Sequence, residues 1–329
     1  MSPGFPNEIV KRSRTIKIAA RMSDSKLLLG IEIGGTKLQL VCGDATGRIH
    51  ARRRLGVAPA EGAEGVRRQI ERTLPELLTD RSIEAVGVGF GGPVDWRTGR
   101  TNRSHQLAGW SEFPLADWLR AQTGTPVLVD NDANVAALGE SLCGAGIGLN
   151  PVGYVTLGSG VGGGLVTEGK IYHGAPPGEA EIGHLLLDRC GTTLEARCAG
   201  WAVDARIRDL NLKEPTGVLA RLAGNTAGGE ARHLAAALGQ GDAAAARILR
   251  EVAEDLAFGL SHVVHLFHPQ VIILGGGLSG VGEPLRVAVA AALAGFTMDA
   301  FQPGPEIRLA ALGEDAVPVG ALLLARANH

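Results

Sequence analysis

The sequence LLLGIEIGGTKLQLV, residues 27–41, decides the fold of this chain. Branched apolar residues fill the run from Leu27 to Ile33, a pair of glycines interrupts it, and a second apolar run begins at Leu38. Branched apolar runs of this length form strands, and adjacent glycines supply the backbone freedom that a tight turn needs. The stretch therefore predicts a β-hairpin with a glycine turn.

The sequence YVTLGSGVGGGLV, residues 154–166, repeats this pattern in the second half of the chain. Further strands are predicted at Ala85–Phe90, Val127–Val129 and Val271–Leu274. A long amphipathic helix is predicted over Ala243–Phe267, where apolar residues recur at three- and four-residue steps. Strands that alternate with helices indicate α/β layers, so we expect a duplicated α/β architecture.

Length and composition limit the possible functions. A chain of 329 residues exceeds what one hydrophobic core supports, so two domains with a cleft between them are expected. A net charge of -2 gives no electrostatic reason for a nucleic-acid partner. No apolar run approaches the ~20 residues of a membrane span. We therefore expect small-molecule partners, with no nucleic acid and no membrane.

The cysteines and the N-terminal segment bear on location. Four cysteines are too few and too scattered for a secreted disulfide framework, so reduced thiols in the cytoplasm are expected. The N-terminal segment is basic but lacks the apolar core of a signal peptide. Because Met22 stands shortly before the first strand, residues 1–26 are expected to be a disordered tail or a misassigned start.

Both predicted hairpin turns carry groups that suit a phosphate. The first, Gly34-Gly35-Thr36-Lys37, combines backbone amides with a hydroxyl and an ammonium. A plain hairpin turn with a solvated lysine explains this segment equally well. The second, Gly158-Ser159-Gly160, stands at the matching place of the repeat. Two such turns can face the phosphates of one nucleotide from both halves of the chain.

Polar residues also follow a predicted strand of the first half. Asn131 and Asp132 stand at its end, where ligands collect in open α/β sheets. An ionised carboxylate there could accept the proton of an attacking sugar hydroxyl. The alternative is helix capping, a role that Asp and Asn favour, ahead of a helix predicted over Asn134–Leu142.

Two further segments carry weak signals on their own. Glu181 and His184 place a carboxylate and an imidazole close together, although a lone histidine is usually structural. Gly275-Gly276-Gly277 follows a strand directly. It would let a flat base lie against the backbone, or form an ordinary strand-to-helix turn. The joint order of these signals along one chain makes them specific.

That order resembles the ROK family of sugar kinases, in the actin-like ATPase superfamily, from Leu27 to Ala327. GIEIGGTK (residues 30–37) and LGSGVGGG (157–164) resemble the two phosphate motifs of the family. HPQVIILGGGLS (268–279) is similar to its adenosine-side segment. NDAN (131–134), with Gly139-Glu140 after it, resembles the segment that holds the catalytic aspartate.

The resemblance implies an α/β, two-domain actin-like ATPase (ribonuclease H-like) fold with an interdomain cleft. The small domain would span residues 27–143, completed by a C-terminal helix over 314–329, and the larger domain 144–313. The implied reaction is ATP-dependent phosphorylation of a hexose hydroxyl with Mg2+. Glucose is the first choice, which would make the protein a glucokinase, and N-acetylmannosamine, fructose or another hexose are the alternatives. A homodimer or homotetramer is expected.

The resemblance also implies the site residues, with Asp132 as the general base. The groups that would hold the sugar are Gly92, Gln106, Asn131, Asp132, Glu181, His184 and Glu195. The groups that would hold ATP are Gly34, Gly35, Thr36, Lys37, Gly158, Ser159, Gly160, Gly275, Gly276 and Gly277. Glu32 replaces the usual Asp at a position associated with the magnesium shell, and Gln106 replaces a common Asn.

The third departure concerns zinc. Members of the family commonly carry C-x-C-G-x-x-G-C-x-E, whose thiolates hold a structural zinc together with a histidine. Here the interval from His184 to Glu195 contains Cys190 alone, Thr193 stands in place of the last cysteine, and Cys198 follows as a reserve. A structural zinc needs four ligands, so no zinc is expected.

The resemblance leaves two rivals to the kinase. Sugar-sensing repressors of the family carry an N-terminal helix-turn-helix, which the roughly 26 residues before the first strand are too short to hold. A catalytically weak sugar-binding regulator is the second rival, motivated by Glu32 and the missing zinc loop. Asp132 favours an active enzyme.

Overall fold

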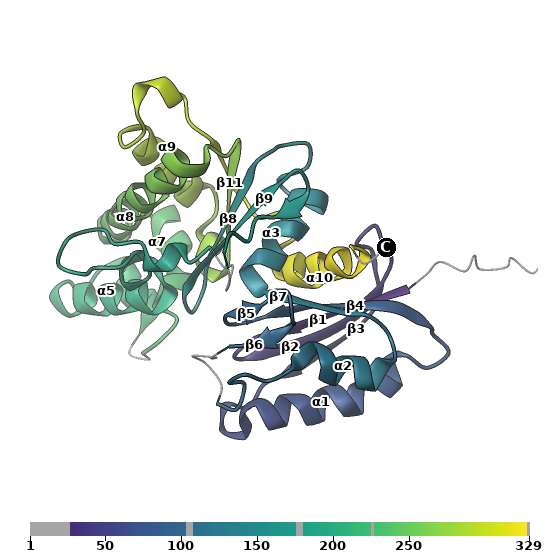
Figure 1. Ribbon diagram of the computed structural model, residues 1–329. Coiled ribbons are helices and arrows are strands. Elements are labelled where there is room, and N and C mark those ends of the chain that lie inside the picture. Colours follow the sequence, from purple (N-terminus) through teal and green to yellow (C-terminus); the bar gives the residue numbers. More distant parts are fainter. Residues whose placement is uncertain (1–26, 103–107, 176–179, 225–226, 328–329) are drawn as a thin grey trace, which may run out of the picture.

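The computed structural model describes residues 27–102, 108–175, 180–224 and 227–327, so Gln106 and the N-terminal extension lie outside the described residues. The described strands form two five-stranded sheets and one small hairpin (Figure 1). The first sheet has the order β3-β2-β1-β4-β7, with strands β1 (Leu27–Ile33), β2 (Lys37–Gly43), β3 (Ile49–Gly56), β4 (Ile83–Phe90) and β7 (Val127–Asn131). The second has the order β10-β9-β8-β11-β12, with strands β8 (Val152–Leu157), β9 (Val161–Thr167), β10 (Lys170–Ile171), β11 (Val271–Gly275) and β12 (Glu306–Leu309). The small hairpin pairs β5 (Val94–Asp95) with β6 (Arg100–Thr101).

The helices lie between and after these strands. The α-helices are α1 (Gly62–Leu77), α2 (Leu115–Thr123), α3 (Asp132–Cys143), α4 (Leu194–Cys198), α5 (Gly200–Lys213), α6 (Val218–Ala223), α7 (Leu234–Gly239), α8 (Ala243–Phe267), α9 (Glu283–Ala294) and α10 (Ala316–Arg326). Short 3-10 turns are η1 (Pro59–Glu61), η2 (Ile182–His184), η3 (Glu230–His233), η4 (Gly277–Val281), η5 (Asp299–Phe301) and η6 (Gly313–Asp315).

The two sheets repeat one topology. In the first, β1 and β2 pair antiparallel, β4 lies parallel to β1, and β7 lies parallel to β4. In the second, β8 and β9 pair antiparallel, β11 lies parallel to β8, and β12 lies parallel to β11. The predicted duplication and both glycine hairpins are therefore confirmed.

The last strand of each sheet leads into a helix that packs on the other sheet. Helix α3 follows β7 and packs on β8 and β9, whereas α10 follows β12 and η6 and packs on β1 and β4. Figure 1 shows α3 and α10 side by side between the sheets. Their contact is close, because a Cβ at Gly320 would lie 1.8 Å from the carbonyl oxygen of Val135. This crossed arrangement joins the two halves through a helix pair.

Each sheet has its own core on its outer face. Helices α1 and α2 cover the first sheet, and α8 is the main cover of the second (Figure 1). The predicted helix over Ala243–Phe267 is confirmed. Its buried stripe, in which each large side chain stabilises the fold by about 1.5–3 kcal/mol, includes Ile248, Val252, Leu256 and Leu260. None of the described helices is long and apolar enough to cross a membrane.

Candidate active site

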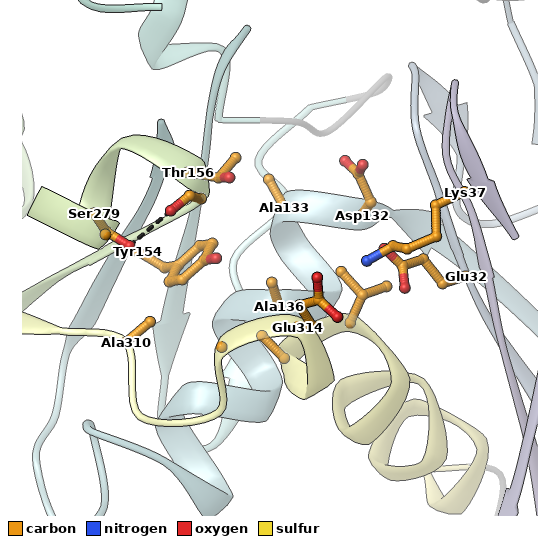
Figure 2. Close-up of a pocket in the computed structure, with 16 residues that line it drawn as sticks. Glu32, Lys37, Asp132, Ala133, Ala136, Tyr154, Thr156, Ser279, Ala310 and Glu314 are labelled. Carbon is orange, nitrogen blue, oxygen red and sulfur yellow. Dashed lines mark hydrogen bonds and ion pairs between the residues drawn. The ribbon is translucent and has the colours of Figure 1, made fainter. Parts of the chain in front are cut away.

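A cavity of about 450 Å³ opens between the two sheets. Its lining comes from both glycine hairpins, from the turn after β11, and from α3 and α10. Figure 2 shows Glu32, Lys37 and Asp132 on one side of the cavity, with Tyr154, Thr156 and Ser279 on the other. The cavity therefore brings together segments that are far apart in the sequence.

The Asp132 side chain takes no part in capping α3, because its neighbour Asn131 fills that role. Strand β7 ends at Asn131, which caps α3 because its side-chain oxygen accepts hydrogen bonds from the amides of Ala133 (2.9 Å) and Asn134 (3.3 Å). The cap leaves Asp132 as the first helical residue, with its carboxyl lining the cavity. The helix capping predicted for this polar cluster is confirmed, with Asn131 as the cap, and the helix starts two residues earlier than predicted because Asn131 stabilises that start.

The environment of Asp132 changes its acidity. Burial raises the pKa of the Asp132 carboxyl from 3.8 to about 7, and the negative charges of Glu32 and Glu181 add to the rise. The backbone amide of Ala133 acts in the opposite direction without cancelling it. A carboxyl that titrates near neutral pH has the proton affinity that suits a general base.

The first glycine turn adjoins a polar network inside the sheet. Glu32 is buried, its Oε1 pairs with Lys37 Nζ at 2.9 Å, and its Oε2 accepts a hydrogen bond of 2.7 Å from the fully buried Gln39. Gln39 in turn accepts from Arg54 Nε at 3.1 Å, and Arg54 pairs with Glu314 at 2.8 Å. Lys37 is therefore only partly solvated, because a buried carboxylate holds its half-buried ammonium.

The second glycine turn is held by backbone and by Glu195. The amide of Gly200, the first residue of α5, donates to the Gly158 carbonyl oxygen at 2.8 Å. Glu195 Oε2 accepts from the amide of Val161 at 2.9 Å, and a Cβ at Gly160 would lie 2.6 Å from that oxygen. Glu195, a predicted sugar residue, therefore lies against a predicted phosphate turn.

The turn after β11 needs its glycines for close packing. A Cβ at Gly275 would lie 2.2 Å from the hydroxyl oxygen of Tyr154. Gly276 has φ +78°, and a Cβ there would lie 2.6 Å from the backbone of Leu157. Because the turn lies directly on the end of β8, the backbone of Gly276 and Gly277 lines the cavity.

Two of the predicted sugar residues, Gly92 and Asn131, meet at the end of β7. The Asn131 amide nitrogen donates to the Gly92 carbonyl oxygen at 3.3 Å. Glu181 precedes η2 and His184 is its last residue, both with exposed side chains, and the charge of Glu181 reaches Asp132. Gln106 lies outside the described residues.

Sequence reasoning missed several residues around this site. His173 Nε2 lies 2.5 Å from the buried Asp130 carboxylate, and its ring stacks on Trp96 with centroids 4.2 Å apart. Tyr154 and Gln39 were also missed. No local signal marks these residues, because their partners lie on other strands or loops; the one clue was Asp130, which stands beside Asn131 in the sequence.

The two cysteines near the missing zinc loop differ in exposure to solvent. The Cys198 thiol is fully buried and lies 3.7 Å from the Val252 carbonyl oxygen, and burial raises its pKa to about 12. Cys190 is exposed. Within the described residues, no three His, Cys, Asp or Glu side chains gather in a way that could hold a metal ion. The absence of zinc remains a prediction to be tested by metal analysis.

Comparison with known proteins adds a family to this geometry. Residues 28–328 match the sequence model of the ROK family. The chain belongs to the ROK family. The resemblance stated from the motifs is thereby confirmed.

Relatives of known name cover almost the whole chain. The glucokinase of Thermotoga maritima is 33% identical over 302 residues, which are 89% of this chain and 95% of that protein. The glucokinase of Halalkalibacterium halodurans is 31% identical over 314 residues, covering 91% of this chain and 94% of that protein. A ROK family glucokinase from Streptomyces griseus, solved with glucose and AMPPNP, is 32% identical with a TM-score of 0.80, over 92% of this chain and 99% of that chain. The predicted two-domain actin-like ATPase fold with its cleft is confirmed by this match.

Proposed function

We propose that this ROK protein transfers the terminal phosphoryl group of ATP to a hexose hydroxyl, with glucose as the substrate. The observation that carries the proposal is Asp132, which lines the cavity between the two sheets and whose carboxyl has a pKa of about 7. The relatives named as glucokinases support the choice of glucose. The Streptomyces griseus relative, solved with glucose and an ATP analogue, supports the pairing of substrates.

Asp132 would act as the general base. Its ionised carboxylate accepts the proton of the sugar hydroxyl while the hydroxyl oxygen bonds to the terminal phosphorus of ATP and the bond from that phosphorus to the ADP oxygen breaks. The raised pKa of Asp132 makes its carboxylate a stronger acceptor than an ordinary aspartate. Asn131 caps α3 and thereby leaves Asp132 free for this role.

The remaining predicted residues divide between the two substrates. We assign the sugar to the backbone of Gly92 and to Asn131, Glu181, His184 and Glu195, with Gln106 a further candidate. We assign the nucleotide to the two hairpin turns and the turn after β11, from Gly34, Gly35, Thr36, Lys37, Gly158, Ser159, Gly160, Gly275, Gly276 and Gly277. The position of Glu195 against Val161 would join the sugar to the second turn.

Magnesium is the metal that we propose for the nucleotide. A divalent cation offsets the charge of the transferring phosphoryl group. Both carboxylate oxygens of Glu32 are already bonded, one to Lys37 and one to Gln39, so Glu32 suits a contact through water rather than direct coordination. The additional methylene of Glu32, compared with Asp, fits this arrangement.

A coupled assay with ATP, in the presence and absence of Mg2+, tests the function against glucose, mannose, fructose, N-acetylglucosamine and N-acetylmannosamine. We expect Mg2+-dependent turnover with glucose as the best substrate. Faster turnover of another sugar would replace glucose in the proposal. Sugar binding by calorimetry without phosphorylation of any sugar would instead favour the weak sugar-binding regulator.

We also propose the domain division 27–143 with 314–329 against 144–313, a homodimer or homotetramer, and a cytoplasmic location. The crossed packing of α10 on β1 and β4 supports the assignment of the C-terminal helix, which begins at Ala316 after η6. All four cysteines are free, which supports a reducing compartment. Analytical ultracentrifugation tests the assembly, and limited proteolysis tests the boundaries.

A further inference from the structure

A buried carboxylate on α3 takes no part in the chemistry described so far. Glu140 is 0% exposed and stands roughly two helical turns after Asp132 on the same helix. No cation pairs with it among the residues that the structure describes. A buried charge without a cation is costly unless hydrogen bonds satisfy it, so its partners show what it stabilises.

The partners of Glu140 are three backbone amides. Oε2 accepts hydrogen bonds from Ala145 at 2.8 Å and from Ala311 at 3.1 Å. Oε1 accepts from Leu312 at 2.8 Å. Hydrogen bonds to an ionised acceptor are about twice as strong as neutral ones. One carboxylate therefore holds two segments that are remote in sequence.

These segments are the two places where the chain crosses between the sheets. Ala145 lies between α3 and β8, where the chain leaves the first half. Ala311 and Leu312 lie between β12 and α10, where it returns. Arg308 reinforces the contact by donating to the Ala145 carbonyl oxygen at 2.7 Å. Glu140 thus ties both crossings to α3.

The returning segment is also part of the cavity. Ala310, Gly313 and Glu314 line it, on both sides of the residues that bond to Glu140. The other end of α3 carries Asp132. A helix is rigid over this length, so the distance between the base and the 310–314 segment depends on how Glu140 holds that segment.

We propose that Glu140 is a positioning residue for the nucleotide: it fixes the cavity wall at 310–314 relative to Asp132 by binding the amides of both crossings. This rests on the proposed function for the identity of the nucleotide. Asn131 and Gly92, which we assign to the sugar, lie at the opposite, N-terminal end of α3, so loss of the Glu140 contacts should weaken nucleotide binding and leave glucose binding largely intact.

A matched control separates this role from plain stability. Asp204 on α5 is also a buried carboxylate, and it accepts from the amides of Gly229 at 2.8 Å and Ala231 at 2.7 Å. It does not line the cavity. Replacing either acid by its amide keeps the shape of the side chain and removes its negative charge. The new NH2 group then faces a backbone N–H, so a hydrogen bond is lost. The amides of Ala311 and Leu312 stand between residues that line the cavity, whereas the amides that Asp204 binds lie at η3, which reaches the cavity only through its contact with η4.

The experiment compares Glu140→Gln and Asp204→Asn with the parent by calorimetry with AMPPNP, calorimetry with glucose alone, and thermal melts. We expect both variants to melt at lower temperature. Glu140→Gln should bind AMPPNP about 10-fold more weakly, the scale of one lost charged hydrogen bond, with glucose affinity changed less than about twofold. Asp204→Asn should bind both ligands like the parent.

The proposal is overturned if Glu140→Gln binds AMPPNP within about twofold of the parent, or if Asp204→Asn weakens AMPPNP binding equally. If Glu140→Gln does not fold, Glu140→Asp takes its place, because a carboxylate shortened by one methylene cannot keep all three amides, and the same criteria apply. These measurements need no turnover. A parent that binds AMPPNP but phosphorylates no hexose would therefore defeat the proposed function separately.

Discussion

The hairpins β1–β2 and β8–β9 occupy matching places in the two sheets but differ in polar content. The first carries Glu32, to which both Lys37 and the buried Gln39 are bonded. The second, from Val152 to Thr167, has no charged residue. Its turn is held by Gly200 and by Glu195, which reaches it from α4. The repeated backbone thus offers charges on one side of the cavity and mainly backbone groups on the other.

The N-termini of α3 and α10, the helices that follow the last strand of each sheet, also differ in how their acidic residues are paired. At the start of α3, Asn131 caps the helix and Asp132 makes no ion pair with any of the described residues. At the start of α10, Asp315 stands in the N-cap position that Asn131 occupies on α3, and it pairs with Arg52 at 2.7 Å. An acid that is paired with a cation is a poor base, because the cation stabilises the carboxylate. Of these two helix starts, that of α3 is the one whose acid lines the cavity without an ion pair to any described residue.

The largest expected difference between the two helix N-termini appears when the carboxylate is removed from each. Asp132→Asn should retain glucose binding and lose kcat by about 10²–10⁴-fold, the usual worth of a general base. Asp315→Asn should keep kcat within about twofold, because exposed ion pairs contribute little. Steady-state kinetics with calorimetry for glucose checks both. Turnover of Asp132→Asn within threefold of the parent would exclude Asp132 as the base.

The two turns can be compared by removing one polar group from each. Lys37→Met should raise KM for ATP about 10-fold, since a charged hydrogen bond to phosphate is lost. Ser159→Ala should change it about twofold or less, because the second turn offers mainly amides. Melting temperatures should accompany the kinetics, since Lys37→Met leaves the buried Glu32 without its cation. Equal effects of the two variants would contradict the division of charge between the hairpins.

The pH dependence sharpens the role of the charged hairpin. The pKa of Asp132 is raised to about 7, so the base is protonated and inactive below that pH, and kcat/KM for glucose should rise as pH increases through about 7. Glu32→Gln removes a negative charge that raises this pKa, so its rising limb should move to lower pH. Profiles of the two proteins under saturating ATP test the shift. An unchanged midpoint in Glu32→Gln would disprove the coupling.

The raised pKa has a matching consequence for stability. The folded state binds the Asp132 proton more tightly than the unfolded chain, so this group lowers the stability of the fold as pH rises from about 4 through about 7. Asp132→Asn removes that cost, and its melting temperature should exceed that of the parent more at pH 8 than at pH 5. Melts at both pH values measure the difference. A pH-independent difference would argue against a strongly raised pKa.

The smallest expected effect is that of removing zinc, because neither half of the chain is expected to hold this metal. Protein purified without added metal should contain no stoichiometric zinc, because Cys190 and the buried Cys198 have different environments and three thiolates are not available. A strong chelator should leave the melting temperature unchanged, since structural zinc contributes directly to folding. About one zinc per chain, with a lower melting temperature in chelator, would show that His184, Cys190 and Cys198 bind zinc together with a fourth ligand.

The sequence by itself determined the local elements and the family. The glycine hairpins follow from apolar runs interrupted by glycines. Helix α8 follows from apolar residues that recur about every 3.6 residues over roughly seven helical turns. Asp132 could be selected as the base because a strand, a polar cluster and a helix follow one another within a few residues. The choice between capping and catalysis stayed open, since both roles have the same local pattern.

Only the tertiary structure showed which residue caps the helix and which remote segments surround Asp132. Asn131 takes the capping bonds, and burial with Glu32 and Glu181 nearby gives Asp132 its pKa. The three amides bound by Glu140 are up to 172 residues away in sequence. Such contacts depend on how distant segments pack, and a buried acid carries no local signal for which amides will satisfy it. Periodicity and turn chemistry act over a few neighbouring residues, whereas acidity and alignment arise from burial among remote ones.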